Sequence, residues 1–183
     1  MTVESRNGIS RRSLVKGAAW ALPAVAIATA APAFAISAGP VLPSIDLGLA
    51  CKQGNGPACG PQKFSYAFPI TLKNTTSSPV EFQITSFKKD GTERGVWGIV
   101  TSRTSCAQAP LTAPRCAAAT AKNAVTIPAN TSSMTLWVIS NDTGNNSNSA
   151  LALSWRIVDP TTTGCPVIVS NTVSHSGDSP ICA

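Results

Sequence analysis

An alternation of apolar residues with a period of two is the feature that most constrains the fold of this chain. It is clearest over 64–72, where every second residue is apolar or aromatic: Phe64, Tyr66, Phe68, Ile70 and Leu72. Because successive side chains of a strand point to opposite faces, this pattern predicts a strand with one face in a core. Similar patterns predict strands at 45–49, 80–84, 96–100, 125–127, 134–138, 151–157 and 167–169.

Turn residues separate these segments, and the pair Asp90-Gly91 is the sharpest of them. No long segment after residue 36 has the spacing of an amphipathic helix. The chain has 183 residues, of which 43% are hydrophobic, so it is long enough to bury one proper core. About seven to eight short strands with turns between them predict an all-β protein, a β-sandwich over 44–183.

The first 35 residues have the composition of a cleaved leader. A basic stretch runs to Lys16, an uncharged stretch runs from Gly17 to Ala35, and Ala33 and Ala35 provide the small residues of a cleavage site. Cleavage after Ala35 is expected, and cleavage after Ala33 is the alternative. An uncleaved membrane anchor is less favoured, because the stretch is mostly alanine and contains Pro23 and Pro32.

The stretch from Ser10 to Lys16 resembles the twin-arginine translocation motif. Its matching residues are Ser10, Arg11, Arg12, Leu14 and Lys16. The resemblance is to leaders of exported proteins from Gram-positive bacteria. It implies that the twin-arginine translocon and a signal peptidase are partners during export, and that the mature protein is secreted or at the cell surface. A short flexible segment is expected at 36–43, and the mature form is not expected to span a membrane.

The net charge of +6 depends largely on this leader. Four of the fourteen basic residues and one of the eight acidic residues lie in 1–35, which leaves +3 on the remainder. Those charges are scattered, and only Lys88 and Lys89 form an adjacent like pair. The sequence therefore predicts no nucleic-acid partner, since such a partner needs a clustered basic surface.

All six cysteines follow the leader: Cys51, Cys59, Cys106, Cys116, Cys165 and Cys182. An even number in an exported chain predicts disulfides, although sequence alone leaves their connectivity open. Proximity along the chain favours Cys51–Cys59, Cys106–Cys116 and Cys165–Cys182. A metal site is disfavoured, because there is no C-x-x-C pair and the single histidine stands apart from the cysteines. No cofactor is expected.

The run from Val125 to Thr131 before an alternating strand, and the strand end Leu72-Lys73-Asn74-Thr75, resemble bacterial immunoglobulin-like extracellular domains. The resemblance implies an immunoglobulin-like β-sandwich stapled by disulfides. It implies no particular activity, because that fold carries many unrelated functions.

Four features are candidates for chemistry, and each has a plainer interpretation. His175 is the only imidazole for a nucleophilic device and otherwise is an exposed loop residue. Glu81 and Glu93 form a conceivable acid pair across the Asp90-Gly91 hairpin, where repulsion would leave both solvated. The loop Asn141–Asn148 has oxygen donors for calcium, but a polar hairpin loop explains it. Trp97 and Trp137 are candidates for stacking on a ligand, whereas Trp155 shares its face with core residues.

Three hypotheses for function follow. The first is a non-catalytic extracellular or cell-surface protein with a structural or interaction role. The second is a carbohydrate- or cell-envelope-binding module, which requires an exposed Trp97 or Trp137. The third is a secreted hydrolase, which requires His175 beside a nucleophile or two acids facing one cleft. The scattered charge and the few titratable groups favour the first, with an envelope polymer or another protein as its partner.

Overall fold

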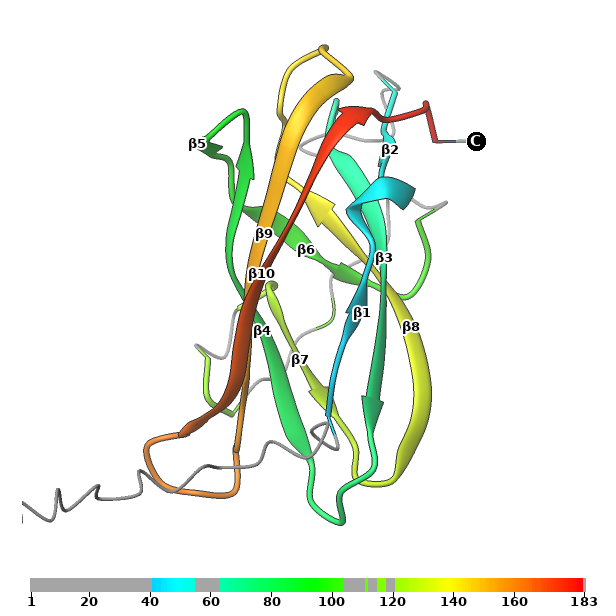
Figure 1. Cartoon of the computed structure of the whole chain (residues 1–183). Coiled ribbons are helices and arrows are strands. Elements are labelled where there is room, and N and C mark those ends of the chain that lie inside the picture. The colour runs from blue at the N-terminus through cyan, green and yellow to red at the C-terminus, as the bar shows by residue number, and fades with distance from the viewer. Residues whose placement is uncertain (1–40, 55–62, 104–110, 112–114, 118–120, 183) are drawn as a thin grey trace, which may run out of the picture. The chain divides into compact units, whose positions relative to one another are not determined.

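The structure, a computed structural model, describes residues 41–54, 63–103, 111, 115–117 and 121–182 (Figure 1). The chain divides into two units, 1–36 and 37–183, and the described residues all belong to the second. The predicted leader, with its motif at Ser10, Arg11, Arg12, Leu14 and Lys16 and its cleavage site at Ala33 and Ala35, lies outside the described residues.

Two antiparallel five-stranded sheets make up the described domain, which confirms the all-β sandwich. The first has the order β1-β3-β8-β6, and β2 also pairs with β3. Its strands are β1 (Ser44–Ile45), β2 (Cys51–Lys52), β3 (Tyr66–Asn74), β6 (Val96–Val100) and β8 (Thr131–Ser140). The second has the order β10-β9-β4-β5, and β7 also pairs with β4. Its strands are β4 (Val80–Lys89), β5 (Thr92–Glu93), β7 (Ala124–Ile127), β9 (Asn148–Val158) and β10 (Val167–Asp178).

The core lies between the sheets and contains the apolar faces that the alternation predicted. In β3, Phe68, Ile70 and Leu72 are fully buried, and their partners in β8 are Val138, Leu136 and Met134. Trp155 in β9 is also a core residue, and its ring centroid lies 6.0 Å from that of Phe82. Burial of such side chains is the main favourable term in folding.

A bulge in β4 extends this strand beyond its predicted end. The register with β9 shifts between Ile84 and Ser86, so that the buried positions change from Phe82 and Ile84 to Phe87. One extra residue reverses the side-chain parity, and this explains why the alternation stopped at 84 while the strand continues to Lys89. The predicted Asp90-Gly91 turn follows, with positive φ at both residues.

The strand predicted at 45–49 is wrong. β1 ends at Ile45, and a single 3₁₀ turn, η2 (Leu47–Leu49), follows it. Asp46 caps this turn by accepting a hydrogen bond from the Gly48 N–H at 2.8 Å. The alternation was misleading because Leu49 is 62% exposed. No helix among the described residues is long and apolar enough to span a membrane.

The cysteines that the structure describes are all paired, but the predicted local pairs are wrong for them. Cys51 is bonded to Cys182, across 131 residues of sequence, and Cys116 to Cys165, across 49. The chain after β10 returns beside β2, where the Lys52 N–H donates to the Pro180 carbonyl at 2.6 Å. Cys51 and Cys182 are therefore neighbours in space. Cys59 and Cys106 lie outside the described residues.

Candidate functional site

A shallow groove beside Trp97 is the first candidate site. Its volume is about 310 Å³, and it lies between the β4–β5 hairpin, the start of β6 and residues 122–123. Trp97 is half-buried, and the Lys122 ammonium lies 5.9 Å from the centroid of its ring. Residues 122–123 form the opposite wall, and two backbone hydrogen bonds hold them in place. The Ile84 N–H donates to the Asn123 carbonyl at 2.8 Å, and the Ile99 N–H donates to the Lys122 carbonyl at 2.9 Å.

Glu93 provides the carboxylate of this groove. It accepts hydrogen bonds from the Ser86 hydroxyl, from the Phe87 N–H at 3.0 Å and from the Gly95 N–H at 3.2 Å. Desolvation opposes ionisation, but these donors and nearby Lys88 outweigh it and hold the pKa of Glu93 below its ordinary value. The carboxylate therefore acts as an ionised acceptor that closes the hairpin.

Trp137 lies on the outer face of the first sheet. It is half-buried against a second apolar cluster made of Cys51, Ala67, Val100 and Ile139. The Arg103 guanidinium lies 5.1 Å from the centroid of its ring and also donates to Cys51 Sγ at 3.2 Å. Trp97 packs against the same cluster, and of the two rings only Trp97 also lines the groove.

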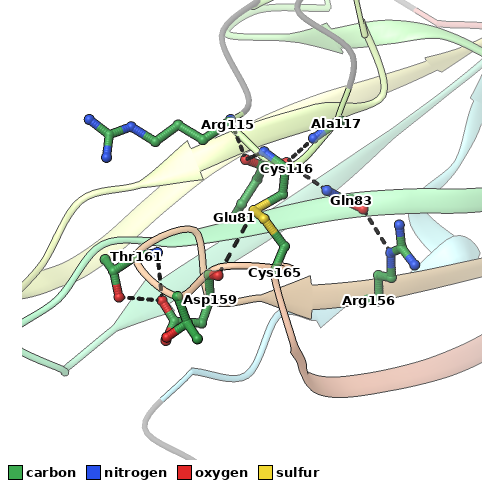
Figure 2. The surroundings of a disulfide bond; sticks show 10 residues. Glu81, Gln83, Arg115, Cys116, Ala117, Arg156, Asp159, Thr161 and Cys165 are labelled. Atoms are coloured by element: carbon green, nitrogen blue, oxygen red, sulfur yellow. Dashed lines mark hydrogen bonds between the residues drawn. A yellow bond between two sulfur atoms is a disulfide. The ribbon is translucent and has the colours of Figure 1, made fainter.

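Glu81 is a fully buried carboxylate, and the expected solvated pair with Glu93 is wrong. Its oxygens accept hydrogen bonds from the N–H groups of Arg115, Cys116 and Ala117 at 2.7, 3.0 and 3.1 Å (Figure 2). The Gln83 amide donates a fourth bond at 2.6 Å. This network, which we call the Glu81 clamp, fastens residues 115–117 to β4 beside the Cys116–Cys165 disulfide. Sequence could not show it, because the three N–H donors lie more than thirty residues away.

The Gln83 side chain extends the Glu81 clamp to β9. Its carbonyl oxygen accepts a hydrogen bond from Arg156 Nε at 2.7 Å (Figure 2). The carboxylate therefore has a cation nearby through one intervening amide. A buried carboxylate needs hydrogen-bond donors around both oxygens, because it can only accept hydrogen bonds and its burial is otherwise costly.

Two buried lysines contact loop 141–147, whose oxygen donors suggested calcium binding. Lys52 and Lys89 are 4% and 5% exposed. Lys52 Nζ donates to Thr143 Oγ1 at 2.6 Å and lies 4.1 Å from the centroid of the Tyr66 ring. Lys89 Nζ donates to the carbonyls of Thr143 and Asn146 at 3.0 and 3.1 Å. We call this arrangement the lysine clamp.

These contacts give loop 141–148 a structural role. The Thr143 and Asn146 carbonyls accept from the Lys89 ammonium, and the Thr143 hydroxyl accepts from the Lys52 ammonium, so these oxygens are occupied where a bound cation would need them. Within the described ranges, no three His, Cys, Asp or Glu side chains gather as a metal site would require. Burial, with a contribution from the charge of Lys89, lowers the pKa of Lys52 to about 8.

His175 lies in β10, so its expected position in an exposed loop is wrong. The imidazole packs against η2, where a Cβ added to Gly48 would lie 3.6 Å from its Cε1 and Nδ1 atoms. Its partner in β9 is Leu151. Among the described residues, no hydroxyl or thiol nucleophile lies within hydrogen-bond distance of this ring.

The comparisons with known proteins show no family. No family model matches the chain, and no curated protein matches it either. One similar solved structure is a FixG-related protein from Vibrio parahaemolyticus, with 10% sequence identity and a TM-score of 0.38. That match covers 76% of this chain and 96% of the other.

Proposed function

We propose that this chain is an exported β-sandwich that acts outside the cytoplasm, secreted or at the cell surface, in a structural or interaction role without catalysis. The disulfides carry this proposal. Cys51–Cys182 and Cys116–Cys165 join segments that are distant in sequence, and such bonds persist in oxidising compartments outside the cytoplasm.

The distribution of polar groups supports a stabilised scaffold. The buried charges of Glu81, Lys52 and Lys89 are occupied in holding irregular segments onto strands. Asp159 does the same in the β9–β10 turn, where the hydroxyls of Thr161 and Thr162 and the Thr161 N–H lower its pKa. Groups used in this way stabilise loops, which suits a domain that presents a durable surface.

The twin-arginine leader supports the proposed route. That pathway exports chains that have already folded, and the sandwich core comes from both sheets without needing a cysteine in its main cluster. The disulfides would then form after export and lock the loops in place.

The route is tested by the double substitution Arg11→Lys/Arg12→Lys in the native host. We expect release of the protein to fall at least about tenfold, because the arginine pair is the feature that the translocon recognises. The matched control is Arg6→Lys, the same change outside the pair. Equal release of the double variant and the control would contradict the proposal.

The groove beside Trp97 supports a second candidate, binding of a carbohydrate or cell-envelope polymer. A half-buried ring with Asn123 and Glu93 nearby provides an apolar face and hydrogen-bonding groups. Binding of the released protein to insoluble envelope polysaccharide should fall about tenfold or more in Trp97→Ala and stay unchanged in Trp137→Ala. Equal loss in both variants, or no binding by the wild type, would remove this candidate.

A further inference from the structure

The free edge of β10 is the longest open strand edge in the described domain. β10 spans twelve residues, Val167–Asp178, and pairs with β9 alone (Figure 1). Its register runs along the whole of β9, from Val167 opposite Val158 to Asp178 opposite Asn148. The other side of β10 therefore presents backbone N–H and C=O groups that no described strand satisfies.

The other edges of the two sheets are much shorter. β1, β2 and β5 have two residues each, β7 has four, and β6 has five. Short edge strands are one way in which β proteins prevent pairing with other chains. β10 lacks the charged and proline protections, because it contains no lysine, arginine or proline, and Asp178 at its end is its only acid. β10 is therefore the edge strand whose backbone groups are most available for pairing with another strand.

Local structure limits the usable part of this edge to its middle. A register irregularity lies between Val167 and Val169. At the other end, His175 and Gly177 lie close together, and the imidazole packs against Gly48 of η2. Residues Ser170–Ser174 lie between these features and are available for pairing.

The side chains of this middle stretch match a copy of themselves. Ser170, Thr172 and Ser174 are exposed and alternate along the outer face. The Thr172 hydroxyl already forms a cross-strand hydrogen bond of 2.8 Å with the Ser154 hydroxyl of β9. Antiparallel pairing of two β10 strands about Thr172 sets Thr172 opposite Thr172 and Ser170 opposite Ser174. Such hydroxyl pairs are favourable across strands, and no charges meet.

We propose that β10 pairs antiparallel with β10 of a second copy of this chain, which joins the two second sheets through a two-fold axis. Such an interface is self-complementary, as a symmetric dimer requires, and its affinity comes from main-chain hydrogen bonds. The proposal rests on the proposed function in one respect, because it names a second copy of the chain as the partner for the interaction role. The pairing itself does not depend on the export route.

The test measures mass in solution by sedimentation velocity over a range of concentrations. Protein is expressed from the full sequence and purified in the form that the host releases or retains. We expect a dimer for the wild type, and dissociation constants at least about tenfold higher for Thr172→Lys and for Thr172→Glu, since each places like charges opposite each other. Mixing the two variants should restore dimers.

The matched control is Thr71→Lys in β3, where Thr71 lies between Ser44 of β1 and Thr135 of β8. It puts the same side chain on an interior strand and should leave the dimer intact. Circular dichroism confirms folding, and Thr172→Glu serves alone if Thr172→Lys does not fold. A monomeric wild type at every concentration, or a dimer that Thr172→Lys and Thr71→Lys affect equally, would overturn the proposal. Neither result bears on export, which the Arg11→Lys/Arg12→Lys comparison measures separately.

Discussion

The Glu81 clamp and the lysine clamp solve the same problem with opposite charges. Glu81 lies near the start of β4, whereas the lysine clamp combines Lys89 at the end of β4 with Lys52 in β2. Each holds an irregular segment through backbone groups, and each has a disulfide nearby. Glu81 alone accepts three N–H groups, because a carboxylate has two oxygens with about four acceptor sites. In loop 141–147, the Lys89 ammonium donates to two carbonyls, and the Lys52 ammonium donates to the Thr143 hydroxyl.

The difference between the clamps is one of electrostatic cost. Glu81 has a cation within its extended network, through Gln83 and Arg156. Lys52 and Lys89 share the Thr143 side chain and backbone, so two like charges approach each other in a buried site. Burial, and after it the charge of Lys89, lowers the pKa of Lys52. We therefore expect the Glu81 clamp to stabilise the fold more than the Lys52 half of the lysine clamp does.

The largest expected effects come from removing the disulfides in pairs. Chain entropy predicts a loss of about 5 kcal/mol for Cys51→Ser/Cys182→Ser and about 4 kcal/mol for Cys116→Ser/Cys165→Ser, because the first closes the longer loop. Guanidinium unfolding without reductant measures both free energies of unfolding. The opposite order would show that local contacts, rather than loop closure, determine what each bond contributes.

Neutralising the Glu81 clamp should have the next largest effect. In Glu81→Gln one oxygen becomes an amide donor and faces the N–H groups it formerly accepted, which should cost about 3 kcal/mol. Urea unfolding provides the measurement. The same change in Glu93→Gln should cost about 1 kcal/mol or less, since that residue is exposed. Equal losses in the two variants would contradict the burial argument.

Coupling between the clamp and its disulfide should be smaller but measurable. Glu81 binds the Cys116 N–H, so Glu81→Gln combined with Cys116→Ser/Cys165→Ser should be non-additive by about 1 kcal/mol. Combined with Cys51→Ser/Cys182→Ser, it should be additive within about 0.5 kcal/mol. A double-mutant cycle from unfolding curves gives both terms. Equal coupling to the two disulfides would mean that the Glu81 clamp and the Cys51–Cys182 disulfide are not energetically independent.

The last prediction concerns the pH dependence of the lysine clamp. The pKa of Lys52 is lowered from 10.5 to about 8 in the folded chain. Between these values the unfolded chain binds a proton that the folded chain has released, so the contribution of Lys52 to the free energy of unfolding rises with pH. Below pH 8 both states are protonated and this contribution is constant.

Subtracting the unfolding free energy of Lys52→Met from that of the wild type isolates this contribution. The difference should increase from pH 8 to pH 10.5. A difference that is flat or decreasing across that range would show that Lys52 keeps an ordinary pKa.

The sequence predicted those parts of the fold that depend on local patterning. The alternation from Phe64 to Leu72 located β3, and the Asp90-Gly91 pair located the hairpin turn. Patterning misled at Leu49, where an Asp46 cap turns the chain out of the strand. It also placed His175 in a loop, because serine and glycine around it look like turn residues whereas β9 holds them in a strand.

The candidate sites were less predictable because their partners are distant in sequence. Nothing near Glu81 indicates that the N–H groups of 115–117 will reach it. Proximity along the chain favoured Cys165–Cys182, yet the spatial partner of Cys182 is Cys51. Ligand stacking on Trp97 and Trp137 stays a prediction, and sequence did not show that both rings pack against one apolar cluster while Trp97 also lines the groove.

Intact mass and peptide mapping of the protein released by its host test the central claim most directly. Alkylation at low pH before a non-reducing digest preserves the native disulfides. We predict a chain that begins at Ile36 or Phe34, with Cys51 linked to Cys182 and Cys116 linked to Cys165. A chain that keeps residues 1–35, or one with free thiols or other partners at these four cysteines, would contradict an exported sandwich stabilised by long-range disulfides.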